Sequence, residues 1–154
     1  VKAAMERGPL VGSPVVDVVV EIYDGKMHPV DSKDIAFQTA GKFAFYEAME
    51  KAKPVLLEPI VNLESFFPAD KFGDISADVS GRRGHPTGTD TLGEMMVFRA
   101  QVPLAEMGDY GSALKSITGG AGFYNMEFSH YEVVPAAVAQ QVIAKAKVVI
   151  EKPE

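Results

Sequence analysis

The sequence predicts an α+β protein in which a short β/α portion precedes a domain built on an antiparallel sheet. Residues 15–23 alternate between mixed and wholly apolar positions, as a strand with one buried face does. Lys53-Pro54 then interrupts a helical pattern, because the residue before a proline disfavours the helical conformation. After this point the pattern predicts strands and helices in the order βαββαβ. We therefore expect two domains, residues 1–53 and residues 54–154.

The first part begins with the end of a helix, residues 1–7, which Gly8-Pro9 stops. Residues 15–23 are the one clear strand before residue 54, and a single strand cannot form a sheet without partners. We expect this strand to pair with the second domain or with another copy of the chain. The first residue is valine and no targeting segment precedes it, which favours further domains upstream.

A helix is predicted from about residue 33 to residue 51. Asp24-Gly25 supplies a tight turn before it, and Asp31-Ser32 offers an N-cap. Apolar side chains recur at helical spacing, so this helix is expected to cover a sheet. They are Ile35, Ala36, Ala40, Phe43, Tyr46 and Met49.

The second part predicts a ferredoxin-like split βαβ fold. Strands are expected at 55–66, 85–90, 94–102 and 122–133, and helices at 68–80, 104–116 and 135–147. Each of the first two helices carries an apolar stripe that would cover one face of the sheet. The stripes are Phe72, Ile75 and Val79, and Met107, Tyr110, Leu114 and Ile117.

Composition excludes several classes of protein. The chain has 154 residues, no cysteine and a net charge of -6, so disulfides and thiolate metal sites are excluded. The absence of cysteine is compatible with a reduced, cytoplasmic setting. No apolar run approaches the ~18 residues of a membrane span, so we expect a soluble protein with no membrane partner. Residues 1–53 hold 7 basic and 8 acidic side chains, and residues 54–154 hold 8 and 13. Any contact with nucleic acid must therefore be local.

His28 is the first candidate for chemistry. It stands in a turn between a strand and a helix, with Asp24 and Asp31 nearby. These three residues could ligate a metal, although no second histidine is near. Alternatively, Asp24 forms the turn, Asp31 caps the helix and His28 is an exposed side chain.

Arg82 and Arg83, between Gly81 and Gly84, form the one compact basic cluster. At a helix end they can complement the helix dipole and remain solvated. Alternatively, they grip phosphates, since guanidinium groups bind phosphate oxygens in pairs.

The remaining motifs point to structure. Residues 119–123, GGAGF, lack the lysine and hydroxyl residue of a phosphate loop, so they predict a turn and no nucleotide site. His130 lies in a strand pattern and is expected to be structural. His85 with Asp90 could bind an ion, but the neighbouring Pro86 and Gly88 favour a hairpin. No serine, histidine or carboxylate spacing indicates catalysis.

Two stretches resemble a known family: residues 24–32, DGKMHPVDS, and residues 122–135, GFYNMEFSHYEVVP. They are similar to the last two domains of bacterial elongation factor G. The rest of the chain also keeps the order of that family's shorter motifs. These motifs are Gly8-Pro9-Leu10, Pro14-Val15-Val16-Asp17, Ala36-Phe37, Lys53 to Pro59, Gly73-Asp74, Arg82-Arg83-Gly84, Val102 to Met107, and Ser116-Ile117-Thr118.

The resemblance implies that residues 1–53 are the C-terminal part of a domain IV, a β/α domain like domain 2 of ribosomal protein S5, and that residues 54–154 are domain V. It implies that His28, with Lys26 and Asp31, contacts the tRNA–mRNA pair in the decoding centre of the ribosome. It also implies that Arg82 and Arg83 face ribosomal RNA. The parent protein would use GTP and Mg²⁺ through upstream domains, and this part would bind no cofactor.

The resemblance therefore predicts the ribosome-engaging portion of a GTP-dependent translocase. A related recycling, protection or specialised ribosomal factor shares the architecture. A free-standing ferredoxin-like module that binds a small ligand is a third reading, from a different class.

Overall fold

The computed structural model describes residues 1–27, 29 and 33–146. The chain divides into two compact units. We call residues 57–133 the sheet unit, and residues 1–56 together with 134–154 the helical unit. Among the described residues, no helix combines the length and the apolar character that a bilayer crossing requires.

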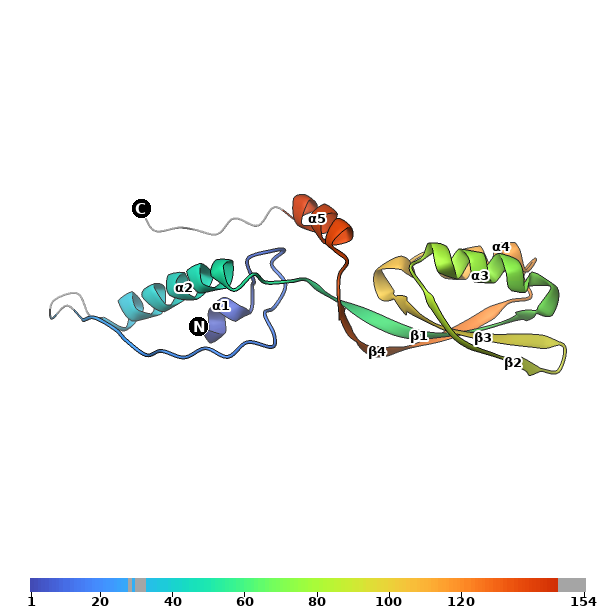
Figure 1. Cartoon of the computed structure of the whole chain (residues 1–154), viewed down its shortest axis with the longest axis horizontal. Helices are drawn as coiled ribbons and strands as arrows, with labels where there is room; N and C mark the ends of the chain where they lie inside the picture. Colours follow the sequence, from blue (N-terminus) through green and yellow to red (C-terminus); the bar gives the residue numbers. More distant parts are fainter. Residues whose placement is uncertain (28, 30–32, 147–154) are drawn as a thin grey trace. The chain divides into compact units, whose positions relative to one another are not determined.

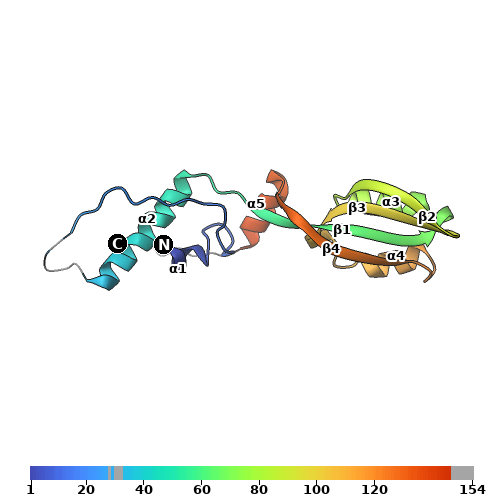
Figure 2. The same cartoon turned by 90° about the horizontal axis from the view of Figure 1, so that it is seen from below.

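The sheet unit is a four-stranded antiparallel sheet with two helices (Figures 1 and 2). Its strands are β1 (Leu57–Pro68), β2 (His85–Leu92), β3 (Met95–Pro103) and β4 (Phe123–Val133), in the spatial order β2-β3-β1-β4. Its helices are α3 (Phe72–Gly81) and α4 (Tyr110–Ile117), each preceded by a short 3-10 turn, η1 (Ala69–Lys71) and η2 (Leu104–Glu106). This is the ferredoxin-like order, so the predicted βαββαβ closure is confirmed.

Both helices lie on the same side of the sheet (Figure 1). Ile75 and Val79 of α3, with Tyr110 and Leu114 of α4, are completely or almost completely buried in one core with β1 and β3. The predicted stripes are thus confirmed for these four residues, for Met107, which is buried, and for Ile117, which is partly buried, whereas Phe72 is 36% exposed. Burial of each such aliphatic side chain stabilises the fold by about 1.5–3 kcal/mol.

Residues 118–122 end α4 and turn the chain into β4. Gly119 and Gly120 have φ of 61° and 91°, which suits glycine because a Cβ is disfavoured there. The Gly120 amide donates to the Lys115 carbonyl at 2.8 Å and the Gly119 amide to the Ser116 carbonyl at 3.5 Å. This double closure is a Schellman cap, and the predicted turn is confirmed.

The helical unit contains α1 (Lys2–Met5), α2 (Asp34–Lys51) and α5 (Ala136–Lys145). Ala4 of α1 packs on Phe45 and Met49 of α2 in a small buried cluster. The hydroxyl of Tyr46 also donates to the Arg7 carbonyl at 3.4 Å. The predicted helix over residues 33–51 is confirmed, beginning at Asp34.

Two expectations about this unit are wrong. Residues 15–23 form no strand in this chain, and the sheet contains only β1 to β4, so they do not pair with the second domain. Pairing with another copy of the chain stays a prediction. Val15 packs against the Ala4–Phe45–Met49 cluster, but the other apolar side chains of this stretch are exposed, with Val19 at 93% and Ile22 at 84%. A strand needs a neighbouring strand to hydrogen-bond with, and the described residues supply none for this stretch. The alternation of side chains along residues 15–23 was therefore not enough to predict a strand.

The second wrong expectation concerns the buried face of α2. Phe45 and Met49 are its buried residues and they contact α1, whereas Ile35 is 71% exposed. The described residues of the helical unit contain no strand that α2 could cover. Lys33 occupies the N-cap position without a side-chain hydrogen bond. The predicted cap, Asp31-Ser32, lies outside the described residues.

Candidate functional site

The loop before α2 is the first predicted site. Lys26 and the neighbouring Met27 are exposed to solvent. The side chain of Asp24 accepts a hydrogen bond from the Gly25 amide at 2.7 Å, which orders the start of the loop. His28 and Asp31, the other two predicted contact residues, lie outside the described residues.

Arg82 follows the end of α3 and is largely buried, with 11% of its side chain exposed. Its Nε donates to Asp78 at 2.8 Å, and its Nη1 donates to the Glu106 carbonyl at 2.7 Å and to Asp109 at 2.5 Å. The guanidinium also lies 5.3 Å from the centre of the Tyr110 ring. This single side chain therefore ties the end of α3 to the beginning of α4.

Arg83 forms a second set of ion pairs. Its Nη1 and Nη2 donate to the two carboxylate oxygens of Glu58 at 2.6 and 3.0 Å, and its Nε donates to Glu106 at 3.1 Å. Its φ of 59° is left-handed, which costs an ordinary residue about 1–2 kcal/mol. The paired hydrogen bonds to Glu58 offset that strain.

We call this network the arginine clamp: Glu58, Asp78, Arg82, Arg83, Glu106 and Asp109. It joins β1, α3, η2 and the start of α4. An open pocket beside it is lined by Asp78, Gly81, Arg82, Ala105, Glu106, Gly108 and Asp109.

Both arginines of the clamp remain charged at neutral pH. Hydrogen bonds to Asp78 raise the pKa of Arg82, and hydrogen bonds to Glu58 raise the pKa of Arg83. The hydrogen bond and charge of Arg82 in turn lower the pKa of Asp109. The expectation of a solvated arginine pair at a helix end is therefore wrong, because intramolecular carboxylates occupy both guanidinium groups.

A buried pair of hydroxyl groups joins α4 to β1 of the sheet. The hydroxyl groups of Tyr110 and Ser65 share a hydrogen bond at 2.5 Å. Burial raises the pKa of the Tyr110 hydroxyl, which stays protonated. The pair therefore satisfies two polar groups that would otherwise be costly inside the core.

The other histidines provide no cluster of ligands. His130 of β4 bonds to Ser129 at 2.8 Å and to Glu132 at 2.7 Å, and its side chain is partly exposed. His85 begins β2, opposite Gln101 of β3. In the part of the chain that the structure describes, no three His, Cys, Asp or Glu residues gather as metal ligands.

Sequence reasoning found Arg82 and Arg83 but not their partners. Asp78 stands four residues before Arg82, and this spacing on a helix is a readable signal for an ion pair. Glu58, Glu106 and Asp109 lie 23 to 27 residues from their arginines, so only the fold brings them together.

Comparison with known families matches both parts of the chain. Residues 1–53 match the model described as elongation factor G, domain IV. Residues 55–142 match the model described as elongation factor G C-terminus.

Individual relatives give the same result. The chain is 50% identical over 145 residues to elongation factor G of Aquifex pyrophilus, and 47% identical over 148 residues to an elongation factor G-like protein of Thermotoga maritima. A crystal structure from Thermus thermophilus covers 94% of the chain at 44% identity with a TM-score of 0.80, and the chain covers 22% of that structure. The match includes 94% and 96% of this chain but 21% and 22% of the curated relatives, so the chain spans about a fifth of their length. The chain belongs to the elongation factor G family of translation factors.

Proposed function

We propose that this chain is the ribosome-engaging portion of a GTP-dependent elongation factor that promotes movement of tRNA and mRNA through the ribosome. The observation that carries the proposal is the pair of adjoining family matches, domain IV followed directly by the C-terminus. GTP and Mg²⁺ act in the longer protein, whose other domains are partners of this chain. The ribosome, in the cytoplasm, is the external partner.

The loop before α2 makes the contact with the tRNA–mRNA pair in this proposal. Lys26 is exposed and can reach a phosphate, and the 18-residue helix α2 follows the loop in sequence. His28 and Asp31 complete the contact. An imidazole suits this position because it can stack on a base and also donate a hydrogen bond.

The arginine clamp holds α3 against η2 and α4 within the sheet unit. The predicted contact between these arginines and ribosomal RNA stays a prediction. It would require phosphates to compete with four carboxylates.

A chimera tests the function. Aquifex pyrophilus elongation factor G, with its matching 145 residues replaced by this chain, should move tRNA and mRNA in a rapid-mixing assay with GTP. The same protein with that segment deleted is the control, and it should not. Retained ribosome-stimulated GTP hydrolysis without movement of mRNA would refute the proposal. Separation of the ribosomal subunits instead of movement would identify a recycling factor.

A further inference from the structure

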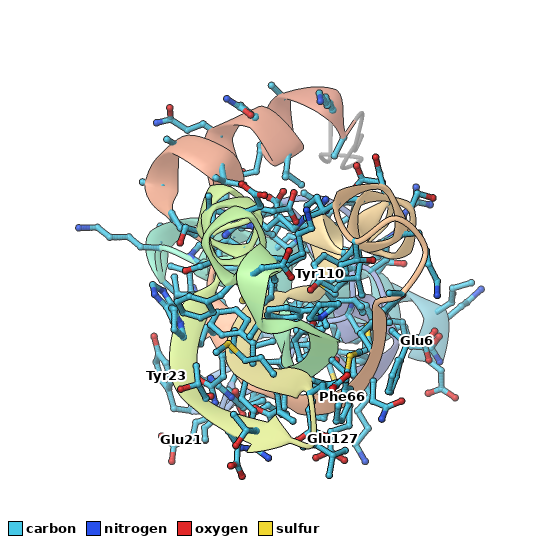
Figure 3. The ribbon with its side chains drawn as sticks, turned by 90° about the vertical axis from the view of Figure 1, so that its right-hand side faces the viewer. Glu6, Glu21, Tyr23, Phe66, Tyr110 and Glu127 are labelled. Atoms are coloured by element: carbon cyan, nitrogen blue, oxygen red, sulfur yellow. The ribbon has the colours of Figure 1, made fainter. Side chains whose placement is uncertain are left out.

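One face of the sheet carries no helix of the sheet unit, and its side chains form ordered rows. Leu63, Phe98 and Tyr124 face the helices, so residues that alternate with them along β1, β3 and β4 face the other way. Figure 3 shows Phe66 and Glu127 on the side of the sheet opposite to Tyr110. The rows across β2, β3, β1 and β4 are Asp90-Val97-Phe66-Phe123, Gly88-Arg99-Glu64-Asn125 and His85-Gln101-Asn62-Glu127. We call these twelve residues the open face.

Aromatic rings lie at one end of the open face. Phe66 and Phe123 stack with centroids 4.7 Å apart and planes 8° apart, and Phe123 is 50% exposed. Such a stacked pair presents flat apolar surface and a partially negative ring face to solvent. It can therefore receive an apolar side chain or a cation.

The charge of the open face is negative. Arg99 is its one basic residue, and its Nε is held by Glu64 at 2.8 Å. Asp90 and Glu127 lie on the two edge strands, β2 and β4. Counted over its acidic residues and its arginine, three carboxylates and one guanidinium give the open face a formal net charge of -2.

The rest of the sheet unit is also negatively charged. Residues 57–133, all of which the structure describes, contain 5 basic and 11 acidic residues, so the formal charge of -6 lies entirely in this unit. Three of the five, Arg82, Arg83 and Arg99, are already ion-paired with carboxylates. RNA binding depends on basic side chains that neutralise phosphates, and few basic side chains of the sheet unit are not already ion-paired.

We propose that the open face binds a basic protein segment. Lysine or arginine side chains of the partner pair with Asp90 and Glu127, while an apolar or cationic side chain packs on the Phe66–Phe123 pair. The amide groups of Asn62, Gln101 and Asn125 supply hydrogen bonds between these anchors. This proposal rests on the proposed function, because it names a basic ribosomal protein, rather than ribosomal RNA, as the component that this face meets.

Site-directed photocrosslinking tests the proposal. The chain carrying benzoylphenylalanine in place of Phe123 is bound to purified 70S ribosomes, sedimented and irradiated, and the adducts are digested with ribonuclease or with proteinase K. We expect an adduct that survives ribonuclease and is destroyed by proteinase K. Benzoylphenylalanine in place of Phe72, which is exposed on α3 on the helical side, is the matched control and should give less of this adduct.

Charge reversal provides the second arm. Asp90→Lys with Glu127→Lys should reduce the adduct at least fivefold. Asp70→Lys with Asp74→Lys, which makes the same charge change on exposed residues of η1 and α3, should leave it unchanged. An adduct destroyed by ribonuclease, no adduct, or equal loss in both charge variants would overturn the proposal. Failure of the unmodified chain to sediment with ribosomes would instead count against the proposed function.

Discussion

Arg82 and Arg83 show how a motif can be detected correctly and interpreted incompletely. The two side chains stand where the sequence places them, after a helix and before a glycine. Their local sequence favours either solvent or phosphate as the partner, whereas the fold supplies carboxylates from β1, η2 and the start of α4. Only Asp78, on the same helix, was accessible to sequence reasoning.

Replacing Arg83 with alanine should lower the free energy of unfolding of the chain by about 2–3 kcal/mol, because it leaves the buried Glu58 carboxylate without its paired donors. Urea denaturation followed by circular dichroism measures the change. Arg99→Ala is the control, and it should cost less than about 1 kcal/mol, because the Arg99–Glu64 pair is more exposed. Equal effects would show that burial does not distinguish the two arginines.

The clamp also predicts a pH dependence. Arg82 lowers the pKa of Asp109, so this carboxylate binds protons less readily in the folded chain than in the unfolded chain. Its stabilising contribution is present above the unfolded pKa of about 4 and is lost as pH falls through the lower, folded value. When the pH is lowered below 4, the urea concentration at the unfolding midpoint should therefore decrease more in the unmodified chain than in Asp109→Asn. Parallel pH profiles for the two proteins would contradict this assignment.

His28 gives the prediction at the residue scale that concerns function. His28→Ala in the chimera should slow movement of tRNA and mRNA by about tenfold to a hundredfold, the effect of one lost stacking or hydrogen-bonding contact of roughly 1–3 kcal/mol. Rapid-mixing kinetics measure it. The melting temperature and ribosome-stimulated GTP hydrolysis should stay nearly unchanged. An unaltered rate would remove His28 from the proposed site, and equally slowed hydrolysis would indicate misfolding.

At the scale of elements, sequence reasoning succeeded where the signal is local. The helix stripes of α3 and α4 and the glycine turn after α4 are encoded by residues a few positions apart. The prediction of a strand at residues 15–23 was wrong because strand formation does not depend on local signals alone. Alternation shows which side chains would share a face, but whether a strand forms depends on a partner far away in the sequence.

Two glycines should respond to alanine with opposite signs. Gly120 has φ of 91°, so Gly120→Ala should destabilise the chain by about 1–2 kcal/mol. Gly73 lies inside α3 with open space around its Cβ position, so Gly73→Ala should stabilise the chain by up to about 1 kcal/mol. Urea denaturation of both variants measures the two changes. Destabilisation by Gly73→Ala would show that this position of α3 is not a regular helix.

For the whole molecule, the sequence predicted the fold class, because the six elements of the sheet unit, in the order βαββαβ, close in few ways. The clamp and the rows of the open face could not be predicted from the sequence. Each row, for example, assembles residues from four strands. Contacts of this kind follow from strand register, which a single sequence specifies only weakly.

The whole chain should bind no GTP. Residues 119–122 form a helix cap rather than a phosphate loop, and they carry no lysine. Isothermal titration with GTP and Mg²⁺ should give no heat beyond dilution. Micromolar binding would mean that the chain has a nucleotide site of another kind.

The strand order has a consequence for synthesis of the chain. β1, the earliest strand of the sheet, hydrogen-bonds on one side to β4, the latest, with Leu57 opposite Val133. While residues 123–133 remain in the exit tunnel of the translating ribosome, one edge of β1 stays unpaired and Leu63 lacks its neighbour Met126. The sheet therefore closes only after its last strand emerges, and the nascent chain must keep its apolar β1 soluble until then.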